Sequence, residues 1–324
     1  MLFKRNLEGP AQAAALIDEA RSAAPSGAEP IVAVDQEGGR VARLKEPLVI
    51  LPPARAVAAL DDPGLTRSAG RLVGLELAAL GFTLDFAPVL DIDTNPASPV
   101  IGDRAFGGDP ETVIRHGLAF ARGLREGGVL PCGKHFPGHG DAAIDSHVGL
   151  PRVGLPAERL RAVEMAPFAA YAAERLGPIM TAHVVYPALD PDEPATASRA
   201  ILTDELRGRL GFEGALITDD LEMGAVSRVG GPPAAAVRAI RAGADGLLVC
   251  RDREVREAVV AAVEREARDD AAFRARLAEA ASRVGALERP RARAHGPEWL
   301  GSAEHATLRD AIARRLGAAA SVRP

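Results

Sequence analysis

The most constraining feature of this sequence is the alternation of short apolar runs with longer segments of helical periodicity. The runs are almost continuously apolar, which is typical of parallel strands buried on both faces. This alternation predicts a parallel α/β fold. Six runs have this character: PIVAVD (30–35), FTLDFAPVLD (82–91), GVLPCGKHF (128–136), PIMTAHVVY (178–186), GALITDDL (214–221) and DGLLVC (245–250).

The segments between these runs carry helix start and stop signals. The pair Asp109–Pro110 predicts an N-cap and a first helical residue, and glycines at 127–128 predict the end of that helix. Further helices are expected near 65–80 and across 232–243. After the last apolar run, two more helical patterns follow, separated by a linker that begins at residue 289.

Polar residues stand at the carboxyl end of almost every predicted strand. In a closed parallel barrel these ends meet at one mouth, where barrel enzymes keep their active sites. No glycine-rich phosphate fingerprint follows the first run, which disfavours a dinucleotide-binding sheet. We therefore predict a TIM-type (β/α)8 barrel. The runs account for six strands, or seven if 1–3 is the stub of a first strand, so the barrel can be incomplete there. The polar residues are Asp35, Asp91, Lys134, His135, His183, Asp219 and Asp220.

Length and composition narrow the functional class. The 324 residues fit one barrel, so we expect 1–288 to form it and 289–324 to supply a linker and a helix that packs on it. The net charge is −5 and no basic block precedes the C-terminal tail, which argues against nucleic acid as a partner. No leader-like segment and no apolar run of ~18 residues is found, and the cysteines lie in apolar contexts. We expect a cytoplasmic protein with no membrane partner.

The segment KHFPGHGDAAIDSH (134–147) concentrates histidines and aspartates. A metal site, an acid/base site and a polar surface loop are all compatible with it. Its spacings match neither H-E-x-x-H nor paired cysteines, so we predict no metal. Asp145 and His147 are two residues apart, so in an extended loop their side chains lie on the same side. The carboxylate can then orient the imidazole for proton transfer.

Adjacent carboxylates end the apolar run in LITDDLEM (216–223). Two such groups repel each other and lose solvation, so their presence needs a reason. One that faces the barrel mouth could act as a nucleophile or stabilise a developing positive charge. The structural alternative is a helix N-cap, and Asp220 fits that role. We predict that Asp219, which is nearer the strand, carries the chemistry.

A third polar group lies in VDQEGGRVARL (34–44). Asp35 ends a predicted strand, and Arg40 and Arg43 follow a glycine pair that permits a tight turn. A carboxylate and a guanidinium at a barrel mouth suit sugar hydroxyls, which need both acceptors and donors. A purely structural ion pair explains the same residues equally well.

Together these stretches resemble glycoside hydrolase family 3, and within it the bacterial single-domain β-N-acetylhexosaminidases. The long acid/base segment and TDDLEM are the specific matches. The segments run in family order from about Leu2 to Cys250: VDQEGGRVARL, LPPARA, FAPVLDID, IGDRAFGGDP, GKHFPGHGDAAIDSHVGLP, MTAHVVYPALDP, LRGRLGFEGALITDDLEMGAV and AGADGLLVC.

The resemblance implies a role for each site residue. Asp219 matches the nucleophile that forms a covalent glycosyl-enzyme, and His147 matches the acid/base, held by Asp145. The implied reaction is retaining hydrolysis, with neither metal nor organic cofactor. The implied substrates are N-acetylglucosamine-terminated muropeptides of cell-wall recycling, and we expect a monomer. The residues that match the binders of the terminal sugar are Asp35, Arg43, Arg104, Lys134 and His135.

The chain departs from the family at its start. The family has a helix and a full first strand before the LFKRN-like segment, whereas this chain begins at Met1 inside it. We expect this to affect stability more than the site. Two other classes stay open from the residues alone: a metal-dependent barrel hydrolase and a non-catalytic amino-sugar-binding protein.

Overall fold

The computed structural model describes residues 1–25, 29–98, 100–142, 149–227, 230–287 and 294–320. Its strands are short. They are β1 (Ala33–Val34), β2 (Gln36–Gly38), β3 (Val41–Ala42), β4 (Leu84–Asp85), β5 (Leu130–Pro131), β6 (Gly133–Phe136), β7 (Ile179–Thr181), β8 (Val185–Tyr186), β9 (Asp190–Pro194), β10 (Leu216–Asp220) and β11 (Gly246–Leu248).

Helices occupy most of the remaining described chain. The longer ones are α1 (Pro10–Ser22), α3 (Pro63–Leu80), α4 (Pro110–Glu126), α6 (Ala166–Ala173), α8 (Gly231–Ala242), α9 (Arg253–Asp269), α10 (Ala271–Gly285) and α11 (Ala303–Ala320). The shorter ones are α2 (Ala54–Ala58), α5 (Ala157–Arg159) and α7 (Gly224–Ser227). The helical segments of other periodicity are η1 (Lys4–Asn6), η2 (Gly102–Arg104), η3 (Leu160–Glu164), η4 (Ala195–Ala197), η5 (Ala200–Arg209) and η6 (Pro297–Trp299).

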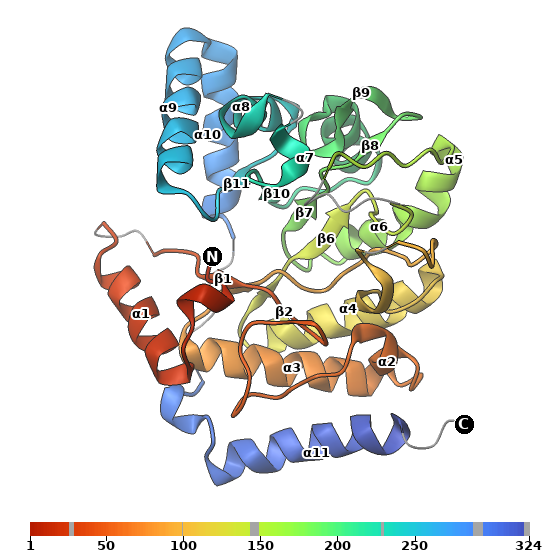
Figure 1. The fold of residues 1–324 in the computed structure, drawn as a ribbon, viewed down its shortest axis with the longest axis vertical. Helices are drawn as coiled ribbons and strands as arrows, with labels where there is room; N and C mark the ends of the chain where they lie inside the picture. The colour runs from red at the N-terminus through yellow and green to blue at the C-terminus, as the bar shows by residue number, and fades with distance from the viewer. Residues whose placement is uncertain (26–28, 99, 143–148, 228–229, 288–293, 321–324) are drawn as a thin grey trace.

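The parallel strands lie side by side in two linked ladders. One ladder has the order β1–β4–β5, and the other has the order β6–β7–β10–β11. Cys132 lies between β5 and β6, and its amide donates to the carbonyls of Asp85 and Ala87, while a bridge pairs Val89 with Lys134. The strands from β1 to β11 in these ladders therefore form one series of parallel neighbours. Their carboxyl ends face the same way (Figure 1).

The predicted α/β fold with parallel strands is confirmed, and each of the six apolar runs contributes a strand to the ladders. Two details differ from the prediction. Within 178–186, β7 is parallel, but β8 pairs with β9 as an antiparallel hairpin. In the part of the chain that the structure describes, no strand pairing joins β11 to β1. Residues 1–3 form no strand, although the Leu2 amide donates to the Ala33 carbonyl at 2.8 Å.

The helix boundaries follow the caps read from the sequence. Asp109 Oδ1 accepts the amide of Thr112 at the start of α4. Asp62 does the same for α3 through the amide of Leu65. Helix α3 ends at Gly81, whose φ of +100° is a left-handed conformation that glycine adopts without a Cβ penalty.

Helices α3 and α4 pack with their backbones in close contact. A Cβ on Gly70 would lie 2.4 Å from the carbonyl oxygen of Phe120, and one on Gly123 would lie 2.2 Å from that of Arg67. Only glycine allows this approach. The pair forms one wall of the apolar core, and α11 runs alongside α3 (Figure 1). Trp299 and the α11 side chains join the same apolar cluster.

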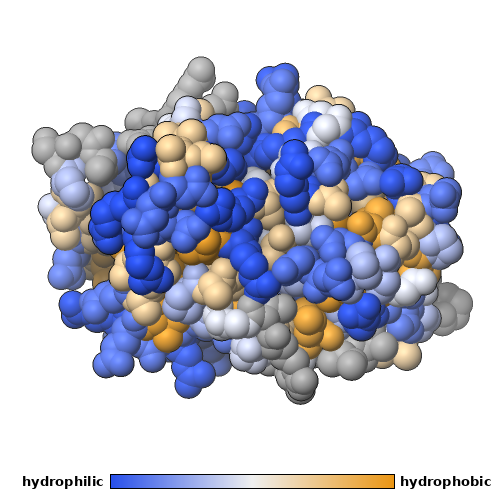
Figure 2. Space-filling model, turned by 90° about the horizontal axis from the view of Figure 1, so that it is seen from above, coloured by the Kyte–Doolittle hydropathy of each residue, from blue (hydrophilic) through white to orange (hydrophobic). Residues whose placement is uncertain are grey.

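Few large apolar side chains reach the described surface. Those that do are Ile31, Ile50 and Val260. The face in Figure 2 is mainly hydrophilic, and its apolar residues lie in small separate groups. Among the described helices, none is long and apolar enough to cross a membrane.

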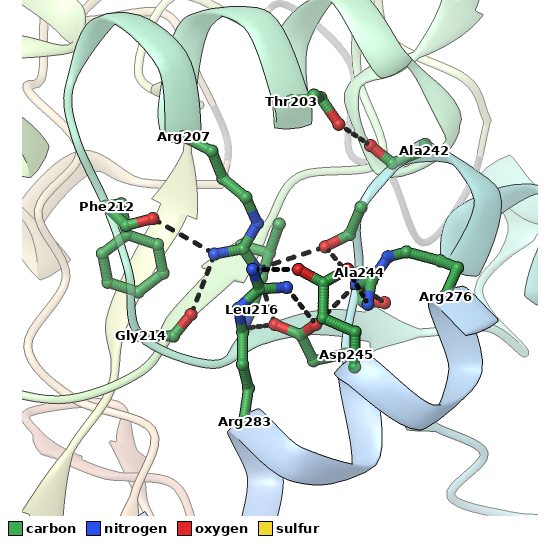
Figure 3. Close-up of polar contacts among 12 residues, drawn as sticks. Thr203, Arg207, Phe212, Gly214, Leu216, Ala242, Ala244, Asp245, Arg276 and Arg283 are labelled. Carbon is green, nitrogen blue, oxygen red and sulfur yellow. Dashed lines mark hydrogen bonds and ion pairs between the residues drawn. The ribbon is translucent and has the colours of Figure 1, made fainter. Parts of the chain in front are cut away.

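A buried carboxylate ties the last strand to the helices that cover it (Figure 3). Asp245, at the start of β11, has a side chain with 0% exposure and accepts from Arg207 of η5 at 2.6 Å. It also accepts from Arg276 of α10 at 2.5 Å, from Arg283 at 3.4 Å and from the amide of Leu216. Burial, only partly offset by Asp245, lowers the pKa of Arg207, and the like charges of the other two arginines lower it further. One carboxylate thus neutralises guanidinium groups from two separate elements.

Replacing that carboxylate should therefore be costly. We expect Asp245→Asn to lower the free energy of unfolding by about 3–5 kcal/mol, because it leaves buried guanidinium groups without their counter-charge. The control is Glu213→Gln, which removes an ion pair with Arg175 whose side chains are 71% and 78% exposed. It should cost no more than about 1 kcal/mol. Urea denaturation measures both, and equal losses would contradict the role of Asp245.

Candidate active site

A pocket of about 200 Å³ opens where the carboxyl ends of the parallel strands meet. It is lined by charged residues from β2, η2, β6, β10 and the positions after β1 and β3, and by apolar side chains from β7, β11 and the neighbouring loops. The lining residues are Met1, Phe3, Asp35, Glu37, Val41, Arg43, Val100, Arg104, Lys134, His135, His139, Met180, Asp219, Asp220, Met223, Leu248 and Cys250.

Five charged side chains form an alternating ladder along one wall of this pocket. Asp35 binds Arg43 at 3.2 Å and the ammonium group of Lys134 at 2.8 Å. Glu37 binds the same ammonium group at 2.6 Å, and it binds Arg104 through both carboxylate oxygens, at 2.8 and 2.9 Å. The order is Arg43–Asp35–Lys134–Glu37–Arg104, so every charge in the ladder has a neighbour of opposite sign.

Burial strengthens these contacts. Burial by itself would raise the pKa of Glu37, but the charges of Arg104 and Lys134 hold it well below its usual range. Burial likewise would lower the pKa of Lys134, and Asp35 and Glu37 raise it instead. At neutral pH Glu37 and Lys134 are therefore both ionised, and the ladder fixes acceptors and donors in a small space.

His135 is held by a carboxylate behind it. Asp91 is fully buried, and its Oδ2 accepts from Nδ1 of His135 at 2.7 Å. Its Oδ1 accepts the backbone amides of His135 at 3.1 Å and His139 at 2.7 Å. Burial would raise the pKa of Asp91, but the neighbouring histidines lower it. Because Nδ1 donates to Asp91, Nε2 is the ring nitrogen left for other contacts.

His139 also lines the pocket, and its ring meets that of His135 edge to face at 5.8 Å. Burial and the neighbouring His135 lower the pKa of His139 to about 4. The ring is therefore neutral near pH 7.

The two adjacent carboxylates at the end of β10 have different surroundings. Asp219 accepts the amide of Asp220 at 2.8 Å. Burial opposes ionisation of Asp219, but His135, the hydrogen bond from the amide of Asp220 and the charge of Lys134 lower its pKa. Asp220 accepts the amides of Glu222 and Cys250, each at 3.2 Å, and burial raises its pKa. Asp220 therefore fixes the turn after β10, while Asp219 presents an ionised carboxylate to the pocket.

Asp85 at the end of β4 is a third kind of carboxyl group. It has 0% exposure, its Oδ1 accepts the amide of Gln36 at 2.9 Å, and its Oδ2 has no partner among the described residues. Burial raises its pKa to about 8, and the negative charges of Asp35 and Glu37 add to this against the opposing effect of Lys134. Asp85 is therefore neutral at pH 7.

The structure brings together six of the residues singled out from the sequence. Asp145 and His147 lie outside the described residues, so their predicted dyad stays a prediction. Among the described residues, no group of three or more histidine, cysteine, aspartate or glutamate side chains has the arrangement of a metal site. The six are Asp35, Arg43, Arg104, Lys134, His135 and Asp219, which all line the one pocket.

Three residues of the site were not predicted as functional: Glu37, Asp91 and His139. Glu37 stands in VDQEGGRVARL between two residues that were considered, and Asp91 ends a predicted strand. Glu37 follows one predicted apolar run closely and Asp91 ends another, which was the available signal. Their partners come from segments far along the chain, for example Arg104 for Glu37.

Comparison with known proteins places the chain in a family. A family model described as glycosyl hydrolase family 3 N terminal domain matches residues 1–287. The chain therefore belongs to glycosyl hydrolase family 3, as the sequence motifs indicated.

Relatives and solved structures agree with this assignment. A β-hexosaminidase of Pseudomonas aeruginosa is 44% identical over 268 residues, which is 82% of this chain and 78% of that protein. A family 3 β-N-acetylglucosaminidase from Paenibacillus sp. superimposes with a TM-score of 0.87 at 38% identity, covering 97% of this chain and 62% of that one. NagZ from Neisseria gonorrhoeae, in complex with N-trifluoroacetyl-D-glucosamine, gives 0.82 at 34% identity, covering 97% and 89%.

The neutral state of Asp85 has a measurable consequence for stability. The folded protein keeps this proton up to about pH 8, whereas the unfolded chain loses it near pH 3.8. Asp85 therefore stabilises the folded form at low pH, and this contribution to the free energy of unfolding is lost as the pH rises through this window. Asp85→Asn does not titrate, so its stability relative to wild type should rise across the window, by up to about 1.4 kcal/mol per pH unit.

The control for this titration is Asp91→Asn. The pKa of Asp91 is lowered, so its contribution is present above the unfolded pKa and is lost only as the pH falls further. The loss of stability caused by Asp91→Asn should therefore stay constant over the same window. Urea denaturation at several pH values measures both variants, and a flat difference for Asp85→Asn would show that Asp85 is ionised in the folded protein.

Proposed function

We propose that this β-N-acetylhexosaminidase is, more narrowly, a retaining exo-β-N-acetylglucosaminidase that acts through a covalent glycosyl-aspartate at Asp219. Its substrates are the terminal non-reducing N-acetylglucosamine units of muropeptides and related peptidoglycan fragments. The observation that carries the proposal is the ionised carboxylate of Asp219 in a small pocket that the five-residue charged ladder also lines.

The ladder supplies the sugar-binding groups. A pyranose presents several hydroxyl groups, each of which donates one hydrogen bond and accepts others. Asp35 can accept from them, and Lys134 and Arg104 can donate to them, because these side chains reach the pocket from fixed positions. The Nε2 atom of His135, held in place by Asp91, adds a further contact. A pocket of about 200 Å³ suits one terminal sugar unit, which supports exo action.

Asp219 is the proposed nucleophile. Its carboxylate attacks the anomeric carbon, the bond to the aglycone oxygen breaks, and a glycosyl ester forms. The amide of Asp220 holds one oxygen of Asp219. The lowered pKa keeps the carboxylate ionised and ready to attack.

His147, oriented by Asp145, is the proposed acid/base, on the strength of the family motif GKHFPGHGDAAIDSHVGLP. In the first step the imidazolium protonates the leaving oxygen, and in the second the imidazole removes a proton from the attacking water. A neutral base has an advantage over a second carboxylate here. A second anion beside Asp219 would raise the pKa of the nucleophile.

The substrate class and setting are proposed on the relatives. The NagZ and β-N-acetylglucosaminidase neighbours make N-acetylglucosamine the expected terminal sugar. The muropeptide aglycone, the cytoplasmic setting and a monomeric state follow from the family resemblance of the motifs. No cofactor enters the proposed reaction.

Release of 4-nitrophenol from its β-N-acetylglucosaminide tests the proposal. We expect turnover of this substrate at least about 100-fold faster than turnover of the matching β-glucoside, because the acetamido group contributes binding that the glucoside lacks. Activity should be unchanged after exhaustive treatment with a chelator, and its loss would favour the metal-dependent alternative. Sugar binding by calorimetry without any product would favour a non-catalytic sugar-binding protein.

A further inference from the structure

We propose that His183 is a positioning residue for the nucleophile, acting through the backbone of Asp220 without touching the sugar. This inference rests on the proposed function of Asp219. His183 follows β7, has 2% exposure and stands next to β10 behind the pocket.

The hydrogen bonds of His183 define its tautomer. Its Nε2 lies 3.1 Å from the carbonyl oxygen of Asp220, and its Nδ1 lies 2.8 Å from the hydroxyl of Thr196. A carbonyl oxygen can only accept, so Nε2 carries the proton. Burial lowers the pKa of His183, which keeps the ring neutral. Nδ1 is then an acceptor, and the hydroxyl of Thr196 shares its one proton between Nδ1 and the carbonyl oxygen of Ala182, which lies 3.0 Å away.

A second hydroxyl supports this arrangement. The side chain of Thr181 lies 2.8 Å from that of Thr196 and can donate to it. Thr181, Thr196 and His183 thus form a short relay of hydrogen bonds that ends at the backbone carbonyl of Asp220. All three side chains are buried, so water does not compete for these contacts.

His183 binds the carbonyl of Asp220, and the amide of the same residue binds the nucleophile, Asp219. The amide of Asp220 donates to Oδ1 of Asp219, and this is the hydrogen bond that fixes the carboxylate within the described residues. His183 therefore anchors Asp220 on the far side of the same residue. A tilt of Asp220 would move the amide and rotate the carboxylate away from the anomeric carbon.

His183 is separate from the sugar-binding wall. It does not line the pocket that contains the ladder, and it lines instead a small cavity with Leu221, Val226 and Ala235 behind β10. From this position we expect His183 to act through Asp220 and not on the sugar itself. Its removal should act on the chemical step and leave ground-state binding unchanged.

The test is steady-state kinetics of three variants with 4-nitrophenyl β-N-acetylglucosaminide. We expect His183→Ala to lower kcat by about 100-fold, since a small misplacement of a reacting group has an effect of this size. KM should stay within about threefold of wild type. His183→Gln keeps an N–H donor near the position of Nε2, so it should recover about tenfold of the lost kcat. Thr196→Val removes the hydroxyl beside Nδ1 and should give a loss of kcat smaller than that of His183→Ala.

A matched control separates positioning from folding. Thr203→Val removes a hydroxyl that donates to the Ala242 carbonyl at 2.8 Å, well outside the pocket lining. It should change the melting temperature without changing kcat.

A His183→Ala enzyme with wild-type kcat and only a lower melting temperature would overturn the inference, as would a raised KM at constant kcat. If His183→Ala does not fold, wild-type kcat in both His183→Gln and Thr196→Val would overturn it instead. Absence of turnover by the wild-type enzyme would instead overturn the proposed function.

Discussion

The ammonium group of Lys134 is the charge on which the rest of the site depends. Its side chain is 3% exposed, and such a group is several kcal/mol less stable in a protein interior than in water unless carboxylates surround it. Asp35 and Glu37 meet that requirement at 2.8 and 2.6 Å, and each is tied to an arginine on its other side. The ladder holds three cations and two anions, so removing Asp35 or Glu37 leaves buried positive charge uncompensated. The ladder therefore fixes the loop after β1, the short helix η2 and strand β6 relative to one another.

The carboxyl groups near the strand ends show how one residue type takes different roles. Asp85 has one amide partner and no cation of its own, so it is neutral. Asp91 is just as buried, but it faces His135 and accepts two amides, so it is ionised. Asp219 is ionised and faces the pocket, whereas Asp220 serves the turn that follows. Burial is common to these groups, and the nearest donor or cation decides the charge of each.

Local signals in the sequence were sufficient for much of this structure. The apolar runs located the parallel strands, and Asp109 and Gly127 marked the two ends of α4, because these features depend on neighbouring residues only. Two features could not be predicted in the same way: the pairing of β8 with β9, and the lack of any pairing between β11 and β1 among the described residues. Pairing depends on contacts between distant segments, which an apolar run does not specify.

The same distinction applies to the site. Asp35, Lys134 and Asp219 were identified because charged residues at strand ends meet in a parallel α/β fold. The role of Glu37 depends on Arg104, which is 67 residues away in the sequence, and so could not be predicted from VDQEGGRVARL. His183 was noted only as a polar strand end, because its partners Thr196 and Asp220 become neighbours only in the folded chain.

The central claim, that Asp219 carries the sugar through a covalent intermediate, can be tested directly in a His147→Ala variant. 4-Nitrophenolate leaves without help from an acid, whereas the second step lacks its base, so the glycosyl-enzyme should accumulate. Acid quenching, peptic digestion and mass spectrometry should find one N-acetylglucosaminyl group on the peptide that contains LITDDLEM, with fragmentation placing it on Asp219. A sugar on Asp220, or no adduct in a variant that still turns over, would contradict the claim.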